Sequence, residues 1–439
     1  MVKLHGTAKV NSKGNLEIGG IDTIDLITKF GTPLIVLDET LIRNNCNTFS
    51  KTLTAKYKNS QLLYASKAFS TPSIYKVIEQ EGFGIDIVSG GELFVALSSG
   101  FPSEKIFFHG NNKSIPELEM ALDNQVGRFV VDNGHELYLL NKLASKKGLK
   151  PKILLRISPG IEAITHKYIQ TGQIDSKFGF VLPNGQAIKT IESLINYPHL
   201  DFKGIHCHIG SQIFDVAFYL KTTKIMLDFM EDIKKKTSTV CQELNLGGGM
   251  GIYYTEADKP FTAEDLLEKV TSMLIEFSKN KNYPLPKLIM EPGRYIVGNA
   301  GTTLYTVGSM KEILGVRKYI AIDGGMSDNI RPSLYQAKYE AAIANKMRYK
   351  RDDLVSIAGK CCESGDILIW DLMLQKAEEN DILAVFSTGA YSYSMSSNYN
   401  SLPRPAVILV QNGKADLIIK RESYEQIIQN HLIPTRFQN

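Results

Sequence analysis

The chain has 439 residues, 43% hydrophobic and 22% charged, so it exceeds the length that one hydrophobic core usually serves and has the composition of a folded globular protein. Its 50 lysines and arginines against 46 acidic residues give a net charge of +4, and the densest basic run, residues 234–236, fits the solvated end of a helix better than a nucleic-acid surface. The five cysteines form no C-x-x-C pair, which argues against a disulfide framework and a zinc site. With no apolar leader and no membrane-length apolar run, we expect a cytoplasmic protein with no membrane or nucleic-acid partner and no metal.

Short β-rich runs alternate with helical patterns from about residue 60 to residue 291, which indicates repeated βα units around a parallel sheet. Eight such units in about 230 residues have the size of a (β/α)8 barrel, similar to a TIM barrel. Apolar residues at helical spacing predict helices over 71–81, 91–99, 115–124 and 134–147. The eight predicted strands are residues 62–66, 85–89, 106–109, 128–132, 153–157, 202–208, 243–246 and 288–291.

After residue 300 the pattern changes to short strands separated by turn signals, which predicts a C-terminal all-β domain. Strand-like runs at 16–19 and 34–37 lie outside the barrel and are expected to join this domain. We therefore predict N-terminal strands in 1–42, the barrel in 43–295 and the β domain in 296–439. The predicted β-domain strands are 304–310, 319–322, 354–358, 367–370, 382–386, 406–410 and 417–420.

Polar residues fall where the predicted barrel strands end, which is where the βα loops of such a barrel converge. Lys67 follows an apolar strand, and apolar surroundings would favour the neutral amine that can form an imine. The alternative is a lysine that extends into solvent. The other polar residues in or beside these strands are Asp86, His109, Arg156, His208 and Glu291.

A run of three glycines, residues 247–249, follows the seventh predicted strand. It can bring backbone N–H groups close to an anion such as phosphate, although a structural turn uses the same residues. His208 and Ser211 are expected near the same barrel mouth, where the imidazole can stack on a ring and the hydroxyl can bind phosphate. A satisfied core histidine is the alternative for His208.

The segment from Glu291 to Arg294 ends the last predicted strand with a carboxylate and a guanidinium. Glu291 can keep a heterocyclic nitrogen protonated, and Arg294 can bind a substrate carboxylate. A structural ion pair between them is the alternative.

In this order and spacing, the motifs resemble those of the fold-type III pyridoxal-phosphate (PLP) decarboxylases, and within them the diaminopimelate decarboxylases, over nearly the whole chain. The barrel motifs are Y-A-S-K (64–67), D-I-V-S-G-G-E-L (86–93), H-G-N-N-K (109–113), H-I-G-S-Q-I (208–213), L-G-G-G (246–249) and E-P-G-R (291–294). The β-domain motifs are D-G-G-M (323–326), C-E-S (362–364) and G-A-Y (389–391). The resemblance implies an alanine racemase-like fold and the decarboxylation of meso-diaminopimelate to L-lysine and CO2, the last step of lysine biosynthesis.

The resemblance also implies roles for particular residues. Lys67 would hold PLP as an imine and later assist proton transfer, His208 would stack on the pyridine ring, and Glu291 would pair with the pyridine nitrogen. Cys362 would reach the active site of a partner subunit and donate a proton, so an obligate homodimer is expected. The implied cofactor-binding residues are Lys67, Asp86, His208, Ser211, Gly248, Gly249, Glu291, Pro292, Gly293, Arg294 and Tyr391.

Diaminopimelate carries a carboxylate as well as an ammonium at its distal end. By the resemblance, Arg294 and Arg331 would hold the distal carboxylate and Glu363 the distal ammonium, with a loop salt bridge as the alternative for Arg331. Cys361 has no match in the family and is expected to be a small buried residue. Residues 165–180 resemble a mobile loop near the active site and are expected to form a lid, unless they are a surface loop with no role. The implied substrate-binding residues are Arg294, Arg331, Tyr335, Glu363 and Tyr391.

Three other functions remain open. The first is a decarboxylase of ornithine, lysine or arginine on the same fold, against which Arg331 and Glu363 argue. Related ornithine decarboxylases have an acidic residue facing the distal amine where this chain has Arg331. A non-catalytic PLP-binding homologue should have lost Lys67, Glu291 or Cys362, and all three are present. An amino-acid racemase should carry a different residue in place of Glu291, because it needs a weaker electron sink, and should lack the Cys362-Glu363 pair.

Overall fold

The computed structural model describes residues 2–161 and 176–437. The chain divides into two compact units. One comprises Arg43–Tyr253 and Ala257–Ile296 and forms a parallel (β/α)8 barrel. The other comprises Met1–Ile42, Tyr254–Glu256 and Val297–Asn439 and is rich in β-strands. The predicted fold class, a TIM-like barrel with an additional β domain, is therefore confirmed.

The barrel is closed by parallel pairing of each of its eight strands with two neighbours, including the pairing of the last strand with the first. A short extra strand, β10 (Phe180–Val181), extends the sheet beside the fifth. Inward-facing apolar side chains fill the interior with a cluster of Leu63, Phe107, Val130, Leu154 and Ile289. The eight strands are β5 (Ser60–Ala65), β6 (Gly84–Ile87), β7 (Ile106–Phe108), β8 (Arg128–Val131), β9 (Lys152–Ser158), β11 (Asp201–His206), β12 (Glu243–Asn245) and β13 (Lys287–Met290).

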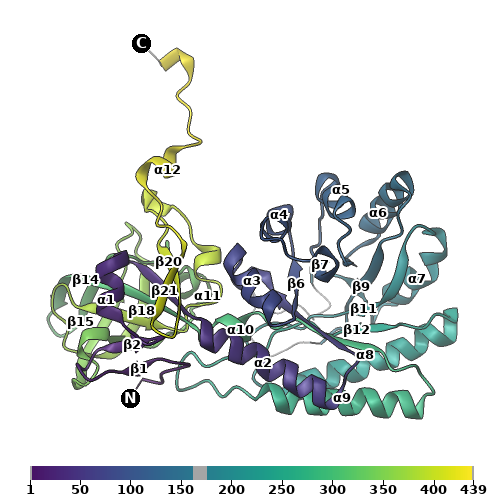
Figure 1. The fold of residues 1–439 in the computed structure, drawn as a ribbon, viewed down its shortest axis with the longest axis horizontal. Coiled ribbons are helices and arrows are strands. Elements are labelled where there is room, and N and C mark those ends of the chain that lie inside the picture. The colour runs from purple at the N-terminus through teal and green to yellow at the C-terminus, as the bar shows by residue number, and fades with distance from the viewer. Residues whose placement is uncertain (1, 162–175, 438–439) are drawn as a thin grey trace. The chain divides into compact units, whose positions relative to one another are not determined.

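Helices surround the barrel strands (Figure 1). Several begin at a capping residue shortly after a strand: Ser89, Ser114 and Asn133 each accept a hydrogen bond from the backbone N–H three residues later. Because these caps fix where the helices start, the loops at the carboxyl ends of β6 and β8 are short. The helices of this part of the chain are α2 (Glu39–Lys56), α3 (Pro72–Gln80), α4 (Gly90–Ser98), α5 (Ile115–Asp123), α6 (Gly134–Lys147), α7 (Gln186–Ser193), α8 (Val216–Thr237), α9 (Ala263–Asn280) and α10 (Arg294–Val297).

The β-rich unit is built from both ends of the chain. Strand β4 (Leu34–Asp38) pairs antiparallel with β14 (Gly301–Ile313) and parallel with β20 (Ala406–Gln411), so an N-terminal strand lies between two C-terminal ones. Its other elements are β15 (Arg317–Ile322), β16 (Ala341–Ile343), β17 (Arg351–Ala358), β18 (Ile367–Gln375), β19 (Ile382–Phe386), β21 (Lys414–Ile419), α1 (Thr23–Phe30), α11 (Arg331–Tyr335) and α12 (Tyr424–Ile428).

The two predicted N-terminal strands have different positions in this unit. The run at 34–37 is part of the large sheet, as β4. The run at 16–19 instead forms β2 (Leu16–Ile18), in a separate three-stranded sheet with β1 (Lys9–Val10) and β3 (Ile21–Asp22). Leu16 and Ile18 nevertheless pack into the same apolar core as Leu34 and Leu304.

Several barrel strands end earlier than predicted. The predicted runs 85–89, 202–208 and 288–291 end past the last residues of β6, β11 and β13, so His208 and Glu291 lie in loops. Residues 165–175 of the predicted lid lie outside the described part of the chain. Among the helices of residues 2–161 and 176–437, none is long and apolar enough to span a bilayer.

Candidate active site

Three of the predicted cofactor residues lie in or directly after adjacent strands. Lys67 lies in the single turn η1 (Ser66–Ala68) directly after β5, Asp86 lies in β6, and Glu291 directly follows β13. Since β5 pairs in parallel with both β6 and β13, these side chains belong to neighbouring strand ends. The carboxyl end of the barrel therefore gathers an amine and two carboxylates.

Lys67 lies in a charged environment. Its side chain is exposed, and its ammonium is near Asp86 and Glu92. Burial and the Glu291 carboxylate raise the pKa of Asp86 well above its usual range, while Lys67 opposes this shift. The apolar surroundings predicted for Lys67 were therefore wrong, because Asp86 in the neighbouring strand and Glu92 in the helix after that strand place carboxylates near its ammonium.

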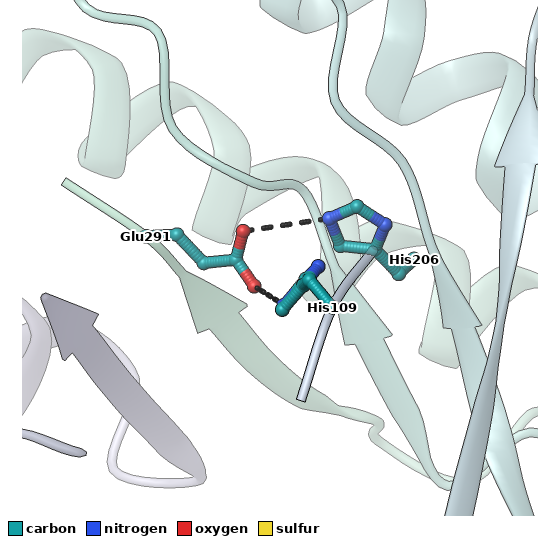
Figure 2. Close-up of side chains that lie close together, drawn as sticks. All are labelled: His109, His206 and Glu291. Atoms are coloured by element: carbon teal, nitrogen blue, oxygen red, sulfur yellow. Dashed lines mark ion pairs between the residues drawn. The ribbon is translucent and has the colours of Figure 1, made fainter. Parts of the chain in front are cut away.

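Glu291 is the centre of a buried polar cluster, shown in Figure 2. Its Oε1 lies 2.9 Å from Nε2 of His109, and its Oε2 lies 3.4 Å from Nε2 of His206. Asn245 donates a hydrogen bond of 2.7 Å to Oε1 and accepts one from the N–H of Gly247. Burial by itself would raise the pKa of Glu291, but His109 and His206 outweigh burial and hold this pKa well below its usual range. Glu291 is therefore an ionised carboxylate inside the barrel.

Metal binding is a second chemical possibility for this cluster. Donor atoms of His109, His206 and Glu291 lie within 4.8 Å of one another. Oε1 of Glu291, however, already accepts the Asn245 amide. The arrangement therefore suits a hydrogen-bonded carboxylate better than a metal ligand.

The glycine run is packed so closely that side chains would not fit. A Cβ at Gly248 would lie 2.1 Å from the carbonyl oxygen of Glu291, and one at Gly249 would lie 2.1 Å from that of Gly210. Gly249 also has φ +107°, a conformation that favours glycine. The N–H of Gly248 donates to Nδ1 of His208 at 3.3 Å, so the run also orients this imidazole.

The loop after β13 closes the barrel beside Lys67. The carbonyl of Pro292 accepts the N–H of Ala65 at 3.4 Å, and a Cβ at Gly293 would lie 2.7 Å from the Ala65 Cβ. Arg294 is buried and its Nη2 donates to Oγ of Ser211 at 3.0 Å. These contacts connect the last barrel strand with the first and with the segment after β11.

Arg331 is a buried cation in the β-rich unit. It begins α11, its Nη1 donates to the Tyr339 hydroxyl, and its guanidinium carbon lies 4.9 Å and 5.6 Å from the ring centroids of Tyr254 and Tyr339. Within residues 2–161 and 176–437, no carboxylate forms an ion pair with Arg331. The predicted alternative, a loop salt bridge, is therefore absent from the described part of the chain.

Cys362 and Glu363 lie on an exposed loop that Asp366 shapes. The Asp366 carboxylate accepts the N–H groups of Cys361 at 2.8 Å and Met326 at 2.7 Å. Cys361 is buried, as predicted, whereas Cys362 and Glu363 are exposed. The loop is joined to α11 by the hydrogen bond from Ser333 to the Gly365 carbonyl. Two further predicted residues of this unit, Tyr335 and Tyr391, are half-buried.

Sequence reasoning did not identify His206, Asn245, Tyr339 or Asp366 as part of these arrangements. His206 had a recognisable signal, because His206 and His208 alternate in the predicted strand 202–208, which would place them on the same side. Tyr339 and Asp366 had none, since their contacts depend on how separate loops fold together.

The barrel residues fit PLP. The glycine run can bind a phosphate, the amine of Lys67 can form an imine with the cofactor, and the ionised carboxylate of Glu291 can pair with a pyridinium. In addition, Oδ1 of Asp86 and Nδ1 of His206 are buried without a hydrogen-bond partner among the described residues. Fold and site together define a barrel enzyme built to hold a phosphorylated, ring-containing cofactor.

Comparisons with known proteins identify the family. A model described as "Pyridoxal-dependent decarboxylase, pyridoxal binding domain" matches residues 39–298. The chain therefore belongs to the pyridoxal-dependent decarboxylases, enzymes that use PLP as cofactor. It is 52% identical to the diaminopimelate decarboxylase of Bacillus subtilis (strain 168), with 97% of each chain covered, and 54% identical to that of Bacillus methanolicus, with 95% of this chain and 97% of the relative covered. Among solved structures, it is similar to diaminopimelate decarboxylase from M. jannaschii in complex with L-lysine, at TM-score 0.92 and 36% identity, with 98% of both chains covered.

Proposed function

We propose that this protein decarboxylates meso-diaminopimelate to L-lysine and CO2, the last step of lysine biosynthesis. The observation that carries the substrate choice is Arg331, a buried guanidinium with an aromatic surround and no carboxylate partner in the described residues. A buried cation is costly unless it is paired, so this site is suited to an anionic group of the substrate. The two close bacterial relatives carry the name of this activity.

Arg331 accounts for the choice between diaminopimelate and simpler basic amino acids. Lysine and ornithine end in an ammonium group and offer a buried arginine no anion. Leaving the buried guanidinium without an anion weakens binding of these amino acids by about 2–5 kcal/mol, the cost of breaking one buried charge pair. At about 1.4 kcal/mol per factor of ten, discrimination should range from about 30-fold to several thousandfold. Arg294 would share the distal carboxylate, and Glu363 would take the distal ammonium.

The remaining roles follow from the chemistry of each side chain. Bound PLP supplies an electron sink for the pair released when the bond from Cα to the carboxylate breaks. We assign Lys67 to covalent attachment of the cofactor and to proton transfer, and Glu291 to holding a proton at the pyridine nitrogen. His208 would stack on the ring, and Ser211, Tyr391 and the glycine run would bind the phosphate.

The remaining predicted residues contact the cofactor or the substrate. Asp86 and the Pro292-Gly293 turn complete the cofactor surround, and Tyr335 would line the substrate site beside Arg331. Cys362 Sγ would deliver the proton that replaces CO2 at Cα.

The direct test is CO2 release by the PLP-loaded protein from meso-diaminopimelate, L-lysine, L-ornithine and L-arginine, each offered separately. We expect release from meso-diaminopimelate alone and none from Lys67→Ala. Arg331→Met should lose at least about 30-fold in kcat/KM with meso-diaminopimelate. Arg348→Met is the matched control, because Arg348 is an exposed arginine of the same unit. Release from another amino acid would overturn the substrate assignment, and release from none would overturn the reaction.

We further propose that the enzyme is a homodimer in which Cys362 completes the partner's site. Its exposed position on the Asp366-shaped loop supports this. Mixing Lys67→Ala with Cys362→Ala subunits tests it, since a hybrid dimer with a shared site regains one intact site. With random exchange, about a quarter of wild-type activity should return, whereas sites confined to one subunit would give none.

The location in the cell is also a proposal. All five cysteines are free in the structure, three of them deeply buried in the barrel, which suits the reducing cytoplasm. Thiol labelling tests this proposal. Protein taken directly from cells and denatured should have five reactive thiols, and a disulfide would contradict the assignment.

A further inference from the structure

The contacts around Glu291 are more extensive than pairing with a cofactor nitrogen requires. An ionised carboxylate inside a protein must be compensated, because burial strongly favours its neutral form. Its partners in Figure 2 are His109, from the end of β7, and His206, from β11; Asn245, from β12, is the third. Among these described contacts, only the Asn245 amide is aligned as a hydrogen bond.

The two imidazoles are tightly confined. Their centroids are 4.8 Å apart with an interplanar angle of 75°, and their side chains are 6% and 1% exposed. Burial lowers the pKa of His109 and lowers that of His206 to about 4, in each case against the opposing effect of Glu291. Both rings are therefore neutral at neutral pH, so they act on Glu291 as N–H donors rather than as positive charges. Each can place its proton on the Nε2 that faces the carboxylate.

Other charged groups also act on this cluster. Arg156, from β9, is attracted to Glu291, whereas Asp86, from β6, is repelled by it. Lys67 and His208 face the same region, and the Cys207 thiol has its pKa raised mainly by burial and further by Glu291. Of all these groups, His109 and His206 are the ones within 3.4 Å of the carboxylate oxygens.

We propose that His109 and His206 are positioning residues which, together with Asn245, keep Glu291 in the ionised form that holds the proton on the cofactor's pyridine nitrogen. This inference rests on the proposed function, since it concerns the same cofactor site. Without the two imidazoles, the proton would be shared between Glu291 and the ring, and the electron sink would weaken.

The test is nitrogen NMR of the holoenzyme reconstituted with PLP labelled with 15N at the ring. In the wild-type protein, we expect the chemical shift of a protonated pyridine nitrogen from about pH 6 to about pH 9. In His109→Gln/His206→Gln, the nitrogen should lose its proton at least about one pH unit lower, and each single variant should be intermediate. Glu291→Gln provides the reference for an unsupported nitrogen, and His135→Gln, an exposed histidine of α6, is the matched control.

Kinetics give a second readout. We expect kcat of the double variant to fall about tenfold to hundredfold while KM changes by less than about threefold, because substrate contacts are untouched. A pyridine nitrogen that keeps the wild-type signal in the double variant would overturn the proposal.

A measurement on the wild-type holoenzyme tests the proposal even if the variants do not fold. With 15N-labelled histidine, His109 and His206 should both be neutral with the proton on Nε2 above about pH 6. A proton on Nδ1 alone in either ring would turn a lone pair toward the carboxylate and overturn the proposal. A holoenzyme with these signals that releases no CO2 would instead refute the proposed function and leave this inference standing.

Discussion

The buried ion pair between Lys113 and Glu136 offers a quantitative test of what holds the barrel mouth together. Their side chains are 1% and 4% exposed, and Nζ lies 2.7 Å from Oε1. Lys113 also donates to the carbonyls of Gly110 at 3.0 Å and Val130 at 2.9 Å, and Glu136 accepts the N–H of Asp132 at 3.0 Å. The pair therefore joins the loop that follows β7 to α6, the helix that follows β8.

Lys113→Met nearly conserves volume but leaves a buried carboxylate without its cation. Breaking such a pair on one side costs about 3–5 kcal/mol. In a unit of this size each kcal/mol lowers the melting temperature by about 2–4 °C, so the barrel should melt roughly 6–20 °C lower. Burial already raises the pKa of Glu136, and Lys113 opposes this shift. In the variant the folded-state pKa rises further, so the stability deficit should be largest near about pH 8 and shrink toward about pH 5 as Glu136 takes a proton.

Differential scanning calorimetry at both pH values measures the effect. Lys147→Met is the matched control, because Lys147 pairs with Asp123 at the surface, where side-chain exposures are 28% and 59%. Such a pair contributes about 0–1 kcal/mol, so the control should shift by no more than about 4 °C. If Lys113→Met shifted the melting temperature no more than Lys147→Met, or if its deficit grew on acidification, the reasoning about the buried pair would be refuted.

The remaining predictions concern the glycine run, Arg331 and the buried carboxyl group of Asp328. Gly248→Ala places a methyl group 2.1 Å from a carbonyl oxygen, so the Kd for PLP in a fluorescence titration should rise at least about tenfold. Gly134→Ala is the control, because a Cβ there meets open space, and it should leave this Kd unchanged. Tyr339→Phe removes the hydroxyl that Arg331 donates to, so steady-state kcat/KM with meso-diaminopimelate should fall about tenfold; an unaltered value would contradict the anchoring of Arg331. Burial raises the pKa of Asp328 to about 7, so the unfolded chain gives up this proton first and stability should fall as pH rises from about 4 to about 7. Asp328→Asn should flatten that part of a plot of Tm against pH, and an identical slope in both proteins would count against this assignment.

The sequence predicted the barrel strands well because buried parallel strands are short apolar runs between helices. The residues at which these strands end were predicted less accurately. His109 and Glu291 directly follow apolar residues with no glycine or proline between, so pattern alone extends the strand through them. Where a barrel strand stops pairing depends on the neighbouring strand, which is information that lies elsewhere in the chain.

The site was predictable to the extent that its residues lie in compact motifs. Glu291 and the glycine run are of this kind. The surroundings of Lys67 were mispredicted because local sequence shows its apolar neighbours in the strand and not the carboxylates that the next strand places beside it. Likewise, the Tyr254 ring near Arg331 comes from a distant segment. Contacts between separate segments are set by tertiary packing, which no motif records.

The position of β4 between β14 and β20 has a consequence during synthesis. The barrel sequence is inserted between β4 and β14, so β4 leaves the ribosome about 260 residues before its first partner does. At about 5–20 residues per second, β4 must wait roughly 13–50 s with both of its edges unpaired. The barrel, by contrast, is nearly continuous in the chain and can fold as it emerges. The order of translation therefore favours a nascent chain whose barrel is formed first, with a waiting apolar N-terminal strand that chaperones would need to cover until the C-terminal strands arrive.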